Sequence, residues 1–269
     1  MSTTTSAPPI RNALAASVAG ACVGTLGGLI GLGGAEFRLP LLIGLFGFIA
    51  LEAVVLNKAI SLIVVASSLL FRSHAVSFGE VLSHYSIALT LLAGSVLGSW
   101  FGADLATRMD SRTLHRVIAA LLACIALVLM TAHDASMQTP PLFTGAAQTL
   151  AGIGAGFVIG VVASFLGVAG GELLIPTLVL LFGLDIKLAG SLSLAVSLPT
   201  MLVGFARYRR DRSFSVVTRY RAFALAMAVG SVIGAFIGGR LLGIVPAGAL
   251  IPVLAAILVI SAFKVWRHQ

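Results

Sequence analysis

Charged residues are scarce in this sequence: Asp, Glu, Lys and Arg together make up 10% of its 269 residues. A soluble domain carries roughly a quarter charged residues, so this chain cannot cover a water-facing surface. Hydrophobic residues make up 59% of the chain, and the mean hydropathy is +1.10. This composition excludes an ordinary soluble protein and points to a chain whose solvent is lipid.

Cysteine is also rare. Cys22 and Cys124 lie far apart, with neither a CxxC spacing nor a neighbouring histidine, which argues against a metal site. The histidines fall near the ends of apolar runs and form no metal-spaced pair inside one, and no GxSxG or HExxH motif is present. We therefore expect no metal, no cofactor and no catalytic residues, and the sequence disfavours an enzyme.

Basic residues outnumber acidic ones, 17 to 9, for a net charge of +8. The Lys and Arg residues cluster at the ends of apolar runs, which is the positive-inside pattern of membrane proteins and not a nucleic-acid signal. Membrane lipid is the partner that this pattern predicts, and we expect no nucleic acid partner.

Long apolar runs fill most of the sequence. A membrane-spanning helix needs about 20 apolar residues, and a β-barrel would show short alternating segments instead. The sequence therefore predicts an all-α polytopic helical bundle. The expected spanning helices are Asn12–Ile30, Ile49–Phe71, Val81–Ala103, Leu114–Ala132, Ala146–Leu166, Ile186–Ala206, Tyr220–Leu242 and Pro246–Trp266. Two further apolar pieces, Phe37–Phe48 and Leu173–Phe182, are too short to span and follow glycine-rich breaks.

The sequence repeats itself after 136 residues without a gap. Glycines, a glutamate and a proline coincide: Gly31 with Gly167, Gly34 with Gly170, Glu36 with Glu172, and Pro40 with Pro176. The predicted organisation is a disordered tail (1–10), a first transmembrane repeat (11–132), a linker (133–145) and a second transmembrane repeat (146–269).

The basic loops do not coincide under this shift. Arg108, Arg112 and Arg116 correspond to an uncharged stretch, and the arginines of 207–212 correspond to a stretch with one Arg and one His. If basic loops are cytoplasmic, equivalent loops lie on opposite faces, which is the pattern of inverted repeats in secondary transporters. We expect both termini in the cytoplasm.

The two glycine-rich motifs predict helices that unwind and restart inside the membrane. Consecutive glycines destabilise a helix, the proline that follows suits the first turn of a new one, and the restarted N-terminus attracts anions. The glycines at 94, 98 and 102 and at 230, 234 and 238 instead fit close helix packing. The residues predicted to bind substrate are Gly31, Gly33, Gly34, Glu36, Asn57, Lys58, Ser61, Gly167, Gly170, Gly171, Glu172, Ser193 and Ser197.

Several of these side chains have more than one interpretation. Glu36 and Glu172 either carry protons or cap the restarted helices. Lys58 either neutralises a bound anion, pairs with Glu36, or extends to the membrane interface. Arg38 has Leu174 at the equivalent position, so we expect it at the interface.

Three segments of the sequence stand out: GTLGGLIGLGGAEFRLPLL, its repeat GVVASFLGVAGGELLIPTL, and LNKAISLIVVASSL. Together they resemble the sulfite exporter TauE/SafE family of membrane permeases. The resemblance covers nearly the whole chain. It implies a bacterial plasma-membrane protein, with a homodimer as one option, that transports sulfur-containing or organic anions such as sulfite, sulfonates or thiosulfate. The sequence thus predicts a secondary anion transporter with protons as a candidate coupling ion; the alternative is a passive anion channel. Two departures, Ala35 against Gly171 and Gly28 against Ser164, distinguish the two motifs.

Overall fold

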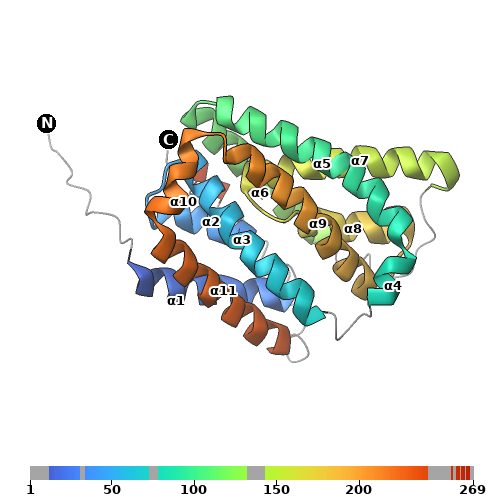
Figure 1. Cartoon of the computed structure of the whole chain (residues 1–269), viewed down its shortest axis with the longest axis horizontal. Helices are drawn as coiled ribbons and strands as arrows, with labels where there is room; N and C mark the ends of the chain where they lie inside the picture. The colour runs from blue at the N-terminus through green and yellow to red at the C-terminus, as the bar shows by residue number, and fades with distance from the viewer. Residues whose placement is uncertain are drawn as a thin grey trace, which may run out of the picture.

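The computed structural model describes residues 12–30, 34–72, 78–131 and 143–241, and within the C-terminal segment residues 256, 259–260, 262–263 and 265–266. Every regular element in these residues is helical (Figure 1), which confirms the all-α prediction. Five of the helices are long and apolar enough to cross a membrane. The predicted tail, Gly31, Gly33, most of the linker and most of the eighth expected helix lie outside the described residues.

The helices follow the expected boundaries closely, because each long helix is one apolar run. In chain order they are α1 (Ala13–Ile30), α2 (Ala35–Gly44), α3 (Ala50–Arg72), α4 (Phe78–Ser83), α5 (Tyr85–Arg108), α6 (Ser111–Thr131), α7 (Gly145–Leu166), α8 (Gly171–Phe182), α9 (Ile186–Tyr208), η2 (Arg212–Phe214), α10 (Ser215–Arg219) and α11 (Arg221–Leu241). The short elements α4, η2 and α10 were not expected from hydropathy.

The second helix break is built on glycine. Gly167 ends α7 with φ +64°, and Gly170 precedes α8 with φ +81°. Residues with a Cβ rarely adopt this left-handed conformation, so glycine lets the chain leave one helix and start the next within four residues. Gly34, immediately before α2, has the same conformation with φ +70°. The predicted interruption of the helices is therefore present at both motifs.

The two prolines lie deeper in the restarted helices than the sequence suggested. Pro40 is the sixth residue of α2 and Pro176 the sixth of α8, so neither is in the first turn. Proline has no N–H, and the residue four positions earlier loses its helical hydrogen-bond donor. Those residues are Glu36 and Glu172, whose backbone carbonyls are therefore released from the helix ladder.

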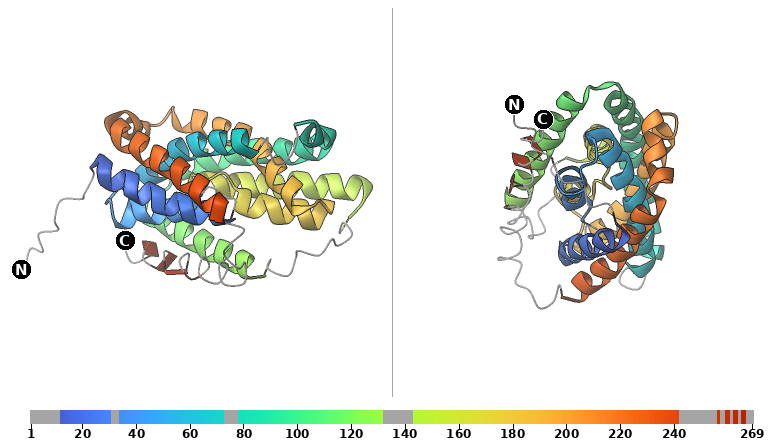
Figure 2. Two further views of the ribbon diagram at one scale, coloured as in Figure 1. Left: turned by 90° about the horizontal axis from the view of Figure 1, so that it is seen from below. Right: turned by 90° about the vertical axis from the view of Figure 1, so that its left-hand side faces the viewer.

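Two pairs of long helices pack with their backbones in contact. α1 lies along α11, and α5 lies along α7 (Figures 1 and 2). A Cβ on Gly20 would collide with the carbonyl of Met227, and a Cβ on Gly156 would collide with the carbonyl of Leu91. The contacts of Gly94, Gly98, Gly230 and Gly234 are equally close, which confirms that these glycines serve helix packing.

These close contacts recur at a fixed offset. Gly20 and Gly156 are 136 positions apart, and so are their partners Leu91 and Met227. Gly24 against Ser231 likewise corresponds to Gly160 against Ser95. The first helix of each half of the sequence thus packs on the fifth α-helix of the other half.

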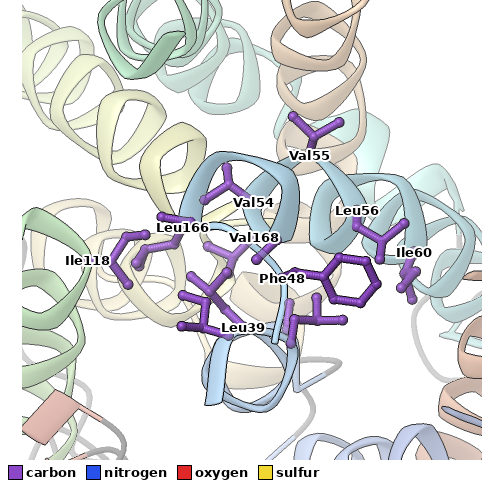
Figure 3. Close-up of a cluster of buried hydrophobic side chains, with 14 of the residues drawn as sticks. Leu39, Phe48, Val54, Val55, Leu56, Ile60, Ile118, Leu166 and Val168 are labelled. Carbon is purple, nitrogen blue, oxygen red and sulfur yellow. The ribbon is translucent and has the colours of Figure 1, made fainter. Parts of the chain in front are cut away.

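The main apolar core surrounds the second break. Figure 3 shows Leu166 and Val168, which flank Gly167, beside Val54 of α3 and Leu39 of α2. All four side chains are buried. α2 itself lies inside the bundle, with eight of its ten residues buried. This packing fixes the break against α3, where the polar residues of the next section lie.

Candidate functional site

Glu36 and Glu172 come together in the interior. Each occupies the first turn of its restarted helix, and their side chains are 1% and 2% exposed. Their carboxyl groups lie close enough for the charge of one to act on the other. None of the four carboxyl oxygens has a hydrogen-bond partner in the described part of the chain. The structure therefore pairs the two glutamates that the sequence repeat placed at equivalent positions.

Arg38 is buried and not at the interface, so the expectation for this residue was wrong. Its guanidinium donates to Asn57 Oδ1 at 3.3 Å, to Ser61 Oγ at 3.0 Å and to Ser231 Oγ at 3.2 Å. These partners come from α3 and α11, far from Arg38 in the sequence. Burial of a guanidinium is tolerated when its fixed fork of donors meets acceptors, and this pocket of neutral oxygens supplies them.

Asn57 ties the two helix breaks to α3. Its Nδ2 donates to the carbonyl of Ala35, where α2 begins, at 3.0 Å, and to the carbonyl of Leu166, where α7 ends, at 2.9 Å. Its Oδ1 accepts from Arg38. An amide offers two N–H donors and one carbonyl acceptor, and all three find protein partners here. The side chain thus holds both breaks in place.

Lys58 lies on another side of α3 and is fully buried, which excludes its extension to the membrane interface. Its Nζ donates to Ser164 Oγ at 3.2 Å and lies 5.8 Å from the centre of the Tyr208 ring. Within the described residues no carboxylate is within ion-pair distance of it; the ion pairs found there involve only Asp104. The predicted pairing with Glu36 is therefore absent from this conformation.

Hydroxyl groups from α5, α7 and α9 surround the lysine. Ser164 Oγ lies 2.9 Å from Ser99 Oγ, and Ser99 Oγ donates to the carbonyl of Thr200 at 3.0 Å. Tyr208 donates to the carbonyl of Ser164 at 2.9 Å. The Nζ of Lys58 and the Oγ of Ser99 occupy the space beside Gly204, where any Cβ would collide with them. This cluster of Lys58 and hydroxyls, which we call the lysine cluster, lies at the C-terminal end of α7.

The remaining predicted site residues are dispersed around these groups. Gly167 packs against the backbone of Val54 and Lys58, and Gly34 packs against Val23. Ser193 donates to a carbonyl of its own helix. Ser197 Oγ is buried and has no hydrogen-bond partner among the described residues.

The two halves are chemically unequal at this site. Lys58 corresponds to Leu194 after the 136-residue shift, and Arg38 corresponds to Leu174. Both buried cations therefore come from the first half of the sequence, whereas each half contributes one glutamate.

The comparisons with known proteins agree with this architecture. The sulfite exporter TauE/SafE family matches residues 16–265, which is nearly the whole chain. The chain belongs to this family. It is also 26% identical over 242 residues to "Probable membrane transporter protein YunE" of Bacillus subtilis (strain 168), a match that covers 83% of this chain and 85% of that protein. No solved structure gives a significant match.

Membership in the TauE/SafE family makes the chain a multi-pass membrane transporter, so its role is transport and not catalysis. The family match spans both helix breaks, the glutamate pair and the lysine cluster. Membership in the family implies that the transported substrate is an anion.

Proposed function

We propose that this TauE/SafE protein is a secondary transporter for small sulfur-containing anions of the sulfite, sulfonate and thiosulfate class, that it is coupled to protons, and that Lys58 binds the anion. The observation that carries the proposal is the burial of Lys58 without a nearby carboxylate. It is a fully buried lysine with one hydrogen-bond acceptor and no carboxylate in ion-pair range within the described residues.

A lone ammonium in this position is costly. Transfer of a charged side chain to the membrane centre costs about 2.5–3.5 kcal/mol on insertion scales. The C-terminal end of α7 offsets part of that cost, because a helix C-terminus carries about half a negative charge. The remaining cost favours the binding of an anion, whose oxygens can accept hydrogen bonds from the two ammonium N–H groups that do not bond to Ser164.

The hydroxyl groups around Lys58 suit an oxyanion. Ser99, Ser164 and Tyr208 can each rotate an O–H donor toward a bound oxygen, because a hydroxyl turns about its C–O bond. In the structure these donors go to backbone carbonyls or to each other. When an anion binds, these hydroxyl groups would exchange their hydrogen bonds within the protein for hydrogen bonds to the anion. The charge of the protein would not change, because the hydroxyl groups are neutral.

We further propose that the transporter consists of two inverted repeats, residues 11–132 and 146–269. It lies in a bacterial plasma membrane, with both termini in the cytoplasm. The asymmetry of the basic loops supports the inverted orientation. The recurrence of the Gly20–Met227 contact as Gly156–Leu91 supports the repeat itself. The two breaks then face each other across the pseudo-two-fold axis, joined by Asn57.

Uptake into proteoliposomes tests the function. Purified protein is reconstituted, and uptake of radiolabelled sulfite, thiosulfate, methanesulfonate and sulfate is measured with and without a pH gradient. We expect saturable uptake of at least one sulfur anion, accelerated by the gradient. Rapid flux without saturation or gradient dependence would identify a passive channel instead. Absence of uptake for all four anions, with correctly inserted protein, would refute the substrate class.

A further inference from the structure

The interior of this protein holds an unusual set of charges. In the described part of the chain the buried Asp, Glu, Lys and Arg side chains are Glu36, Arg38, Lys58 and Glu172. Glu36, Lys58 and Glu172 make no ion pair there, and Arg38 donates hydrogen bonds to neutral oxygens. The buried ring of His115, on α6, bonds to Ser111 of its own helix. The charge balance of the interior therefore depends on how many protons the two glutamates carry.

Two adjacent carboxylates cannot both stay ionised away from water. Two like charges that lie close together repel, and a proton shared between the two carboxyl groups removes that repulsion and supplies a hydrogen bond. No other donor in the described chain satisfies these oxygens. Arg38, the nearest cation from the same helix as Glu36, directs its hydrogen bonds to Asn57, Ser61 and Ser231 instead.

Resting on the proposed anion transport, we infer that Glu36 and Glu172 form one shared proton site, which holds a single proton in the empty protein and takes up a second proton when a dianion binds at Lys58. With one shared proton the pair carries one negative charge, while Arg38 and Lys58 carry two positive charges. The interior then has one net positive charge. A monoanion neutralises it, whereas a dianion leaves one excess negative charge that a second proton on the pair removes.

The position of the pair favours this coupling. Glu36 starts α2 and Glu172 starts α8. Asn57, the neighbour of Lys58, is bonded to the start of α2 and to the end of α7. A displacement of either break during transport therefore moves the glutamates relative to each other and to the anion. Protonation of the second carboxyl removes the charge that would repel the anion, and the proton comes from the aqueous side that supplies the anion.

A first experiment needs only the wild-type protein. Thiosulfate, a dianion, or methanesulfonate, a monoanion, is added to the protein in weakly buffered detergent solution with a pH-sensitive dye, and bound anion is counted in parallel. The shared site predicts about one proton taken up per bound thiosulfate and none per bound methanesulfonate. Equal proton uptake for both anions, or none for thiosulfate, would overturn the inference.

A second experiment compares Glu36→Gln, Glu172→Gln and the double variant in proteoliposomes. If the two carboxyls are one site, each single substitution abolishes the acceleration by the pH gradient as fully as the double substitution does. Independent sites would instead give partial single losses that combine in the double variant, and that result would overturn the inference. Glu52→Gln, at the start of α3, is the matched control and is expected to keep the gradient response.

Thiosulfate exchange at equal pH, measured in every variant, separates this inference from the proposed function. Variants that exchange thiosulfate retain the fold and the anion site, so a lost gradient response in them reports on the proton site alone. Wild-type protein that neither binds nor exchanges any of the anions would refute the transport proposal itself. Should a glutamine variant fail to fold, the dye measurement on wild-type protein still decides the inference.

Discussion

The contact between α5 and α7 gives a sharp prediction for Gly156→Ala. A Cβ at position 156 would lie 3.1 Å from the carbonyl carbon of Leu91 and closer still to its oxygen. Backbone atoms of a packed helix cannot turn aside as a flexible side chain can, so the two helices must separate. Overpacking of this kind costs about 1–3 kcal/mol, and we expect Gly156→Ala to be destabilised accordingly.

Gly154→Ala is the matched control on the same helix. A Cβ at position 154 meets no atom within 4 Å. Alanine is favoured over glycine in a helix by about 1 kcal/mol, so this variant should be as stable as the wild type or slightly more stable. Gly156→Ala gains the same helix preference, so the difference between the two variants is the overpacking cost alone, about 1–3 kcal/mol.

Thermal unfolding of the detergent-solubilised protein, followed by size-exclusion chromatography, measures the difference. At about 2–4 °C per kcal/mol, Gly156→Ala should lose its monodisperse peak several degrees below Gly154→Ala. Gly20→Ala should show a similar loss, because it meets Met227 as Gly156 meets Leu91. Equal stability of Gly156→Ala and Gly154→Ala would refute the close approach of α5 and α7.

Two further predictions concern stability. Asn57→Leu leaves the buried carbonyls of Ala35 and Leu166 without their hydrogen-bond donor, which costs about 1–3 kcal/mol for each carbonyl. The unfolding temperature of this variant should therefore fall well below that of the wild type. An unchanged unfolding temperature would contradict the role of Asn57 in holding the two helix breaks together. Hydrogen bonds from the side chain and backbone of Thr113 hold the pKa of Asp110, before α6, below its ordinary value. A carboxyl with a lowered folded pKa stabilises the protein above its unfolded pKa and loses that effect as pH falls through the folded value, so Asp110→Ala should be less stable at neutral pH, with a gap that closes in acid; a gap independent of pH would contradict this.

The helices were predictable because hydropathy alone defines them. A run of about 20 apolar residues has no alternative to a helix in lipid, so the boundaries of α3, α7 and α9 agree with expectation to within a few residues. The short elements α4 and α10 lack that signal, because they are too short to be recognised by hydropathy. The position of Pro40 was misjudged for a related reason: the start of α2 is set by the left-handed Gly34, and a run of glycines does not reveal which one adopts that conformation.

Only part of the candidate site could be predicted from the sequence. The repeat drew attention to Glu36 and Glu172, and the structure brings them together. Arg38 was misplaced because the burial of a cation depends on acceptors from other helices, here Asn57, Ser61 and Ser231, and no local spacing reveals them. Ser231 matches Ser95 in the repeat, within the glycine-rich packing faces. Two matched serines in otherwise apolar helices were the available signal for the polar interior.

The most direct test of the central claim is thiosulfate affinity in the variant Lys58→Met. Loss of a buried, hydrogen-bonded charge from an interface costs about 2–5 kcal/mol, which corresponds to affinity weaker by about 30-fold or more. Arg209→Met removes a positive charge from an exposed position just after α9 and is the control, expected to bind as the wild type does. If folded Lys58→Met protein binds thiosulfate as tightly as the wild type, Lys58 does not bind the anion and the account fails. If its affinity alone falls by this margin, the lysine cluster is the anion site.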